Sequence, residues 1–160
     1  MVQEQCNWTQ RRLERVERVL IVDDYRGAAV ATAECLSLNG LQTRVAGGCA
    51  EALEILRYWA ADVVLLDLMM PQRDGFATAR AFRGNPKSCE TFICAYTSKD
   101  GDFVTRNSER MLFDGYFRKG AAPDRLLAFL QRLCVSRDIS PRNCRPSATP
   151  SMQSTPTSMN

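Results

Sequence analysis

Acidic residues end two apolar segments of this sequence, and a lysine ends a third. They are Asp23 and Asp24 after residues 19–22, Asp67 after residues 63–66, and Lys119 after residues 115–118. A short, continuous apolar segment is typical of a strand buried on both faces of a parallel sheet, so the charged residues should meet at one sheet edge. Carboxylates held there repel one another by roughly 1 to 4 kcal/mol per pair at about 4 Å, which a cation must offset. Oxygen ligands suit Mg²⁺, and a carboxylate beside Mg²⁺ and a lysine has the minimum equipment of a covalent phosphoryl acceptor.

The sequence of 160 residues contains no histidine. This excludes a Ser-His-Asp triad, a Cys-His pair, an HExxH zinc site and a phosphohistidine on this chain. The chain therefore cannot be a histidine kinase or a histidine phosphotransfer module, and in phosphoryl transfer of this kind it could only be the receiving partner.

Composition predicts one domain in a reducing compartment. The length and the 45% hydrophobic content suit one core, and the net charge of +3 gives little support to nucleic-acid binding. The seven cysteines are odd in number and form no CxxC pair, so we expect free thiols. No apolar stretch is long enough for a membrane span or a signal peptide, which predicts a cytoplasmic protein without membrane contact.

Strand and helix patterns alternate along the chain. The expected strands are residues 19–22, 41–46, 63–68, 91–97 and 115–118. The expected helices follow Asp24, Gly48, Gly75 and Asp100, and the last begins near Pro123. The helix expected within residues 100–112 has the weakest apolar face. These units predict an α/β fold with a doubly wound, five-stranded parallel sheet, whose ligands bind beyond the carboxyl ends of the strands.

With these motifs the sequence resembles the receiver domain of two-component response regulators, of the stand-alone, single-domain type. The resemblance is carried by residues 20–24, 67–71 and 74–76, by Thr97-Ser98, and by residues 113–116 leading to Lys119. It implies the flavodoxin-like (βα)5 fold over residues 18–136. Residues 1–17 would form an N-terminal extension, part of which could be a charged helix, and residues 137–160 a disordered tail rich in Ser, Thr and Pro.

The resemblance also implies a role for each site residue. Asp67 would be the phosphoacceptor, Asp24 a direct Mg²⁺ ligand, and Asp23 a ligand acting largely through water. The backbone carbonyl of Met69 would complete the protein's share of the metal site. Further members are Thr97, which would donate its hydroxyl to the phosphoryl group, Lys119, which would pair with the phosphoryl oxygens, and Tyr116, an aromatic switch that would turn inward when Thr97 moves.

The residue after Lys119 departs from the family pattern. Receivers usually carry a proline there, and this chain has Gly120. Glycine is the more flexible residue, so we expect a less constrained loop and slower phosphorylation or a weaker signal.

Three functions are compatible with the sequence. The favoured one is a phosphorylation-switched module that receives its phosphoryl group from a sensor histidine kinase or a histidine phosphotransfer protein. It would act by binding an unknown downstream protein, as a monomer or a phosphorylation-dependent dimer. The alternative is a constitutive interaction module. A phosphohydrolase is disfavoured, because such enzymes carry a second acid two residues after the nucleophile, where this chain has Met69. No DNA-binding domain is recognisable.

Overall fold

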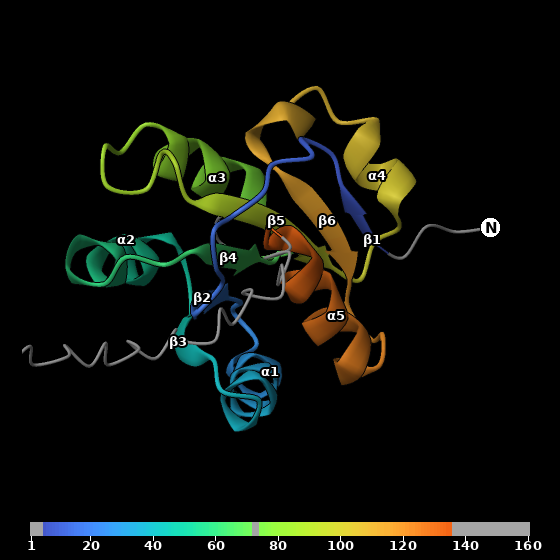
Figure 1. The fold of residues 1–160 in the computed structure, drawn as a ribbon. Coiled ribbons are helices and arrows are strands. Elements are labelled where there is room, and N and C mark those ends of the chain that lie inside the picture. The colour runs from blue at the N-terminus through green and yellow to red at the C-terminus, as the bar shows by residue number, and fades with distance from the viewer. Residues whose placement is uncertain (1–4, 72–73, 136–160) are drawn as a thin grey trace, which may run out of the picture.

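The computed structural model describes residues 5–71 and 74–135, which form one sheet with helices on both faces (Figure 1). The strands are β1 (Gln5–Asn7), β2 (Arg18–Val22), β3 (Gln42–Ala46), β4 (Val63–Leu66), β5 (Phe92–Thr97) and β6 (Gly115–Arg118). The helices are α1 (Arg26–Leu38), α2 (Cys49–Tyr58), α3 (Gly75–Arg83), α4 (Gly101–Thr105), the 3-10 turn η1 (Arg110–Leu112) and α5 (Pro123–Leu133). The predicted tail, residues 137–160, lies outside the described residues.

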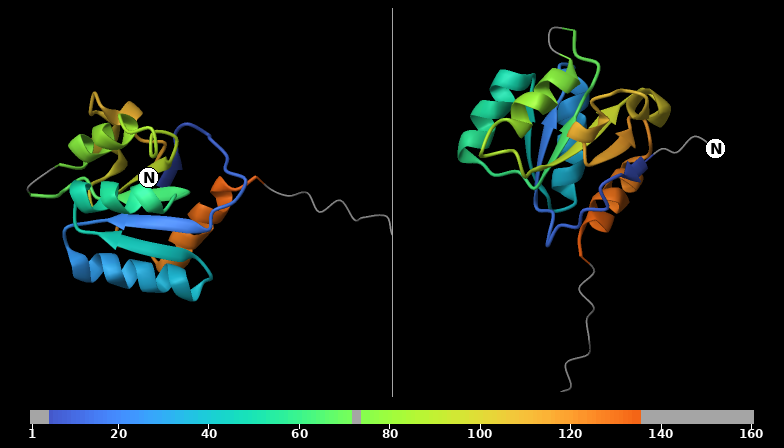
Figure 2. Two further views of the ribbon diagram at one scale, coloured as in Figure 1. Left: turned by 90° about the vertical axis from the view of Figure 1, so that its left-hand side faces the viewer. Right: turned by 90° about the horizontal axis from the view of Figure 1, so that it is seen from above.

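The sheet has the order β1-β6-β5-β4-β2-β3. Strands β2 to β6 are all parallel, which confirms the predicted α/β fold. Strand β1 adds to the edge of β6 in the antiparallel direction and was not predicted. The sheet is therefore mixed, with six strands instead of five. Figure 2 shows the sheet and its helices from two further sides.

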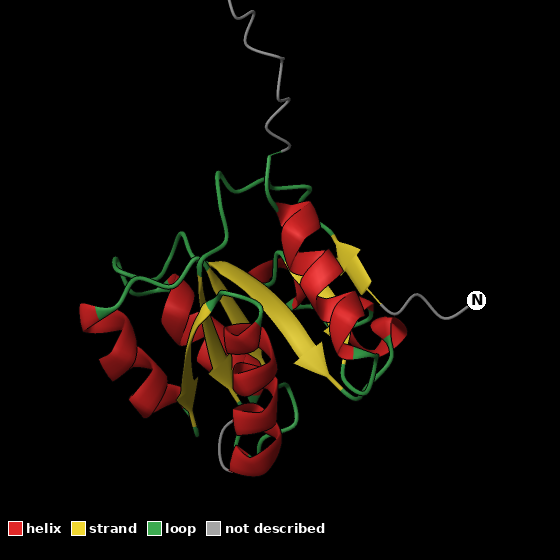
Figure 3. Ribbon diagram, turned by 60° about the horizontal axis from the view of Figure 1, so that its bottom comes forward, coloured by secondary structure: helices red, strands yellow, loops and turns green. Residues whose placement is uncertain are grey.

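Two hydrophobic layers hold the helices against the sheet, because alternate strand residues point to opposite faces. In β2, Leu20 packs in a layer with residues of α2 and α3, while Ile21 packs in a layer with residues of α1 and α5. Helices α1 and α5 accordingly lie together on one face of the sheet (Figure 3). In β6, Tyr116 belongs to the α2 and α3 layer, and Phe117 to the α1 and α5 layer.

Two segments differ from the sequence-based expectation. The charged helix expected in the extension is absent from the described residues: the chain there forms an isolated bridge instead, with the Leu13 amide donating to the Leu133 carbonyl and the Val135 amide to the Leu13 carbonyl. The helix expected within residues 100–112 is split into α4 and η1. Between them, the side chain of Asn107 accepts a hydrogen bond from the amide of Glu109, and such local bonds compete with the helix.

The first residue of helix α3 packs against the backbone of Asp67, the residue that follows β4. The Asp74 side chain caps α3 by accepting from the Ala77 amide at 2.6 Å. A Cβ atom on Gly75 would lie 2.3 Å from the Asp67 carbonyl oxygen and 2.7 Å from the Leu68 Cα. Only glycine permits this close approach, so Gly75 helps to fix the backbone of Asp67. None of the helices in the described part of the chain is long and apolar enough to cross a membrane.

Gly75→Ala is expected to destabilise the protein by about 1 to 3 kcal/mol, because the added methyl group must displace backbone atoms of Asp67 and Leu68. Gly48→Ala is the matched control, since no described atom lies within 4 Å of the Cβ position at Gly48. Urea unfolding of both variants measures the difference. Equal stability of the two variants would contradict the close packing behind Asp67.

Candidate phosphoacceptor and metal site

Three carboxylates meet at the carboxyl end of the sheet, as predicted. Strands β2 and β4 pair in parallel with Val22 beside Leu66, so the next residues, Asp23 and Asp67, emerge side by side. One oxygen each from Asp23, Asp24 and Asp67 lies within 4.8 Å of the other two. Asp23 and Asp67 are buried, whereas Asp24 is exposed. The cluster is therefore inside the protein on one side and open to solvent on the other.

Lys119 supplies the positive charge of the site. Its backbone amide donates to the Thr97 carbonyl at 2.8 Å, which holds it at the end of β6. Its Nζ atom lies 2.6 Å from Asp23 Oδ2 and 2.9 Å from Asp67 Oδ2. Burial lowers the pKa of Lys119, but hydrogen bonds to the two carboxylates and their charges outweigh this effect and raise its pKa above the ordinary value. The lysine therefore stays charged at neutral pH.

The remaining oxygens of the two buried carboxylates are held by backbone amides. Asp23 Oδ1 accepts from the Tyr25 amide at 2.9 Å, and Asp67 Oδ1 accepts from the Met69 amide at 3.1 Å. These bonds orient each carboxylate without adding a full positive charge. The exposed carboxylate of Asp24 forms no ion pair with any described residue. Three negative charges thus face one positive charge.

An all-oxygen donor set with surplus negative charge fits a hard divalent cation. The approach from solvent is open, because a groove of about 610 Å³ runs past Asp24 and is lined by Gly47, Gly48, Glu51 and Met70 among others. The chain therefore has an acidic triad able to hold a metal ion. Met69 is 48% exposed and lies at the surface beside this site.

Thr97 and Tyr116 are linked through the backbone of Lys99. Thr97 ends β5 and is fully buried, and its Oγ1 accepts from the Lys99 amide at 3.3 Å. The Tyr116 hydroxyl donates to the Lys99 carbonyl at 2.7 Å. Tyr116 is only 1% exposed, and its ring stacks on Trp8. The ring therefore lies inward. Its contact with Trp8, which is remote in the chain, was not predicted.

Gly120 adopts a conformation that proline does not reach. Its φ is +85°, in the left-handed region that glycine enters freely, whereas proline is fixed near −65°. The loop after Lys119 is thus built around this glycine, which gives the departure from the family pattern a structural basis.

Asp114, which belongs to one of the recognised motifs, has a structural role. Its Oδ2 accepts from Arg83 Nη2 at 2.7 Å and from the Ile93 amide at 2.9 Å. The residue is buried and ties α3 to the start of β5 and β6. It stands apart from the acidic triad.

Comparison with known proteins identifies the family. The model of the response regulator receiver domain matches residues 19–131, and the chain belongs to this family. It is therefore a receiver domain of two-component signalling rather than a dedicated enzyme. Its acidic pocket is consistent with phosphoacceptor signalling.

Individual proteins with similar sequences or structures are consistent with membership of this family. The response regulator MprA of Mycobacterium tuberculosis is 32% identical over 121 residues, which cover 72% of this chain and 50% of MprA, so the chain spans about half of that relative. The chemotaxis protein CheY4 of Vibrio cholerae has 26% identity and a TM-score of 0.68, covering 74% of this chain and 98% of CheY4. The response regulator TrrA of Thermotoga maritima, solved in complex with Mg²⁺ and BeF, has 25% identity and a TM-score of 0.64, covering 74% of this chain and 99% of TrrA.

A divalent cation is expected to stabilise the folded protein, because it offsets repulsion among carboxylates that only the fold brings together. At about 100 times its dissociation constant, Mg²⁺ would contribute roughly 2.7 kcal/mol. Thermal melting with Mg²⁺ and with EDTA measures this gain. Asp24→Asn should remove most of it, whereas Asp102→Asn, which removes an exposed carboxylate on α4, should keep it. An unchanged midpoint at saturating Mg²⁺ would contradict the metal site.

Proposed function

We propose that the chain is a signalling module that accepts a phosphoryl group on Asp67 from a phosphohistidine of a sensor kinase or a histidine phosphotransfer protein. The observation that carries the proposal is the position of the Asp67 carboxylate, which lies 2.9 Å from the Lys119 ammonium inside an acidic cluster. A phosphoryl acceptor needs an in-line nucleophile and fixed positive charge for the oxygens of the transferring group. Membership of the receiver family supports the same role.

In the transfer, an oxygen of Asp67 attacks the phosphorus atom and forms a new P–O bond. The P–N bond to the histidine of the donor breaks, and its electron pair stays on the imidazole nitrogen. Lys119 would then pair with the phosphoryl oxygens, since its Nζ already contacts Asp67. The hydroxyl of Thr97, whose oxygen accepts from the Lys99 amide, would donate its own hydrogen to the same phosphoryl oxygens as it turns toward them.

Asp23, Asp24, Asp67 and the backbone carbonyl of Met69 would hold Mg²⁺. The ion would neutralise charge on the phosphoryl oxygens when bound. The oxygen-only donor set, the exposed position of Asp24 and the groove beside it support this assignment. Asp24 would be the direct ligand, and the buried Asp23 would act largely through water.

The output would be a change in affinity for a downstream protein. Movement of Thr97 would be transmitted through the backbone of Lys99 to the Tyr116 hydroxyl. The face formed by α4, β6 and α5 would respond, because α4 has only five residues and η1 is a single 3-10 turn. Phosphorylation-dependent dimerisation is one form of this output.

A constitutive interaction module is the second candidate. Two features favour it. Gly120 stands where receivers usually have proline and adopts a left-handed conformation, and α4 is short. In this case the acidic site would be a remnant, and partner binding would not depend on phosphate.

Incubation with acetyl phosphate or phosphoramidate and Mg²⁺ should add one phosphoryl group to the protein, stable in acid and labile in base. Intact mass measures the adduct. Asp67→Asn should not form it, because an amide lacks the nucleophilic carboxylate, whereas Asp102→Asn should form it normally. An adduct on Thr97 or Ser98 would contradict the assigned roles, absence of an adduct would favour the constitutive module, and steady release of phosphate would indicate a phosphohydrolase.

Beryllofluoride, which mimics the phosphoryl group, should shift amide resonances from Thr97 to Arg118, well beyond the neighbours of Asp67. The reason is that Thr97, Lys99 and Tyr116 are joined by hydrogen bonds, so movement of the first alters the environment of the last. Two-dimensional NMR of the labelled protein measures these shifts. Shifts confined to the neighbours of Asp67 would contradict the switch.

A further inference from the structure

Residues 5–9, here called the N-terminal strap, cover the edge of the sheet beside β6. Gln5, Cys6 and Asn7 pair with Phe117, Tyr116 and Gly115. The amides of Trp8 and Thr9 both donate to the Asp114 carbonyl, at 2.9 and 3.2 Å. The strap is thus bound to β6 by main-chain hydrogen bonds on the side of the molecule where α4 and α5 lie (Figure 1).

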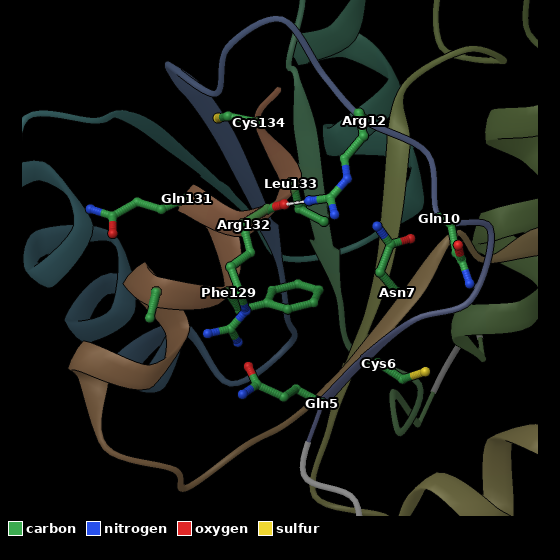
Figure 4. A pocket seen from close by; sticks show the side chains of 11 residues that line it. Gln5, Cys6, Asn7, Gln10, Arg12, Phe129, Gln131, Arg132, Leu133 and Cys134 are labelled. Atoms are coloured by element: carbon green, nitrogen blue, oxygen red, sulfur yellow. Dashed lines mark hydrogen bonds between the residues drawn. The ribbon is translucent and has the colours of Figure 1, made fainter. Parts of the chain in front are cut away.

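The strap is fixed mainly on its β6 side. A groove of about 740 Å³ separates part of it from α5, lined by Gln5, Asn7 and Arg132 among others (Figure 4). The side-chain oxygens of Gln5 and Asn7 are buried without a hydrogen-bond partner among the described residues. In contrast, a Cβ atom on Gly115 would lie 2.8 Å from the Cys6 carbonyl oxygen, so the strap closely approaches β6.

Trp8 places its ring against the ring of Tyr116. The two centroids are 6.0 Å apart, and the ring planes are inclined by 18°, a stacked arrangement. The guanidinium of Arg110 lies over the Trp8 ring at 5.6 Å. This contact exists because the Tyr116 ring is inside, where its hydroxyl reaches the Lys99 carbonyl. If Tyr116 turned outward, both the stacking on Trp8 and the bond to Lys99 would be lost.

We propose that Trp8 is a positioning residue that holds Tyr116 inward and thereby favours occupation of the phosphoryl site. This inference rests on the proposed function, in which Thr97, at the phosphoryl site, is coupled through Lys99 to the inward Tyr116. A group that contacts only one of two states shifts the equilibrium toward that state. Because coupling is reciprocal, the strap strengthens binding of the phosphoryl group, and the phosphoryl group strengthens attachment of the strap.

The test compares Trp8→Ala with Trp8→Phe in the full chain. The alanine variant loses the ring, and the phenylalanine variant keeps a ring that stacks on Tyr116. Titration with beryllofluoride at fixed Mg²⁺ should show binding weakened by about fivefold or more in Trp8→Ala and largely restored in Trp8→Phe. Hydrogen exchange without any added ligand should be faster at residues 115–118 in Trp8→Ala alone.

The outcomes separate this inference from the proposed function. If the unchanged chain binds beryllofluoride and Trp8→Ala binds it equally well or more tightly, the coupling is overturned while the proposed function stands, even if the variant melts at a lower temperature. If the unchanged chain does not bind beryllofluoride at all, the proposed function fails and the coupling fails with it. Should Trp8→Ala not fold, Trp8→Leu, which keeps an apolar side chain without a ring, takes its place with the same expectations.

Discussion

The Lys119 ammonium lies between the carboxylates of Asp23 and Asp67, and this contact is the constraint on which the rest of the site depends. Parallel pairing of β2 and β4 forces the two acids to emerge side by side in a buried position. Their repulsion is relieved by one lysine at the end of β6 and by two backbone amides. The exposed Asp24 then leaves the cluster with surplus negative charge, which makes the site suited to a divalent cation and to the transfer of an anionic group.

The same arrangement connects the site to a distant edge of the sheet. The amide of Lys119 is bound to the carbonyl of Thr97, so the lysine and the predicted switch residue lie at the ends of neighbouring strands. From Thr97, hydrogen bonds through Lys99 reach Tyr116, and stacking reaches Trp8. A continuous set of contacts therefore connects Asp67 with the N-terminal strap.

The sequence was sufficient to predict the parallel sheet and the residues of the acidic site, because residues 19–22 and 63–66 are continuous apolar segments that end in carboxylates. The roles of Asp67, Thr97, Lys119 and Tyr116 stay predictions. Strand β1 was not predicted, because Gln5, Cys6 and Asn7 show no apolar or β-branched pattern. Their pairing with β6 depends on the close approach at Gly115, which sequence patterns do not reveal. The split of the fourth helix depends on local bonds at Asn107, which periodicity does not reveal.

A crystal structure of the chain with Mg²⁺ and beryllofluoride would show whether Asp67 is the phosphoacceptor. We expect beryllium bonded to an Asp67 oxygen, Lys119 in contact with fluoride, and Mg²⁺ on Asp24 and the Met69 carbonyl, with Tyr116 inward beneath Trp8. Beryllium or Mg²⁺ bound at other residues, with Lys119 still paired to both Asp23 and Asp67, would contradict it.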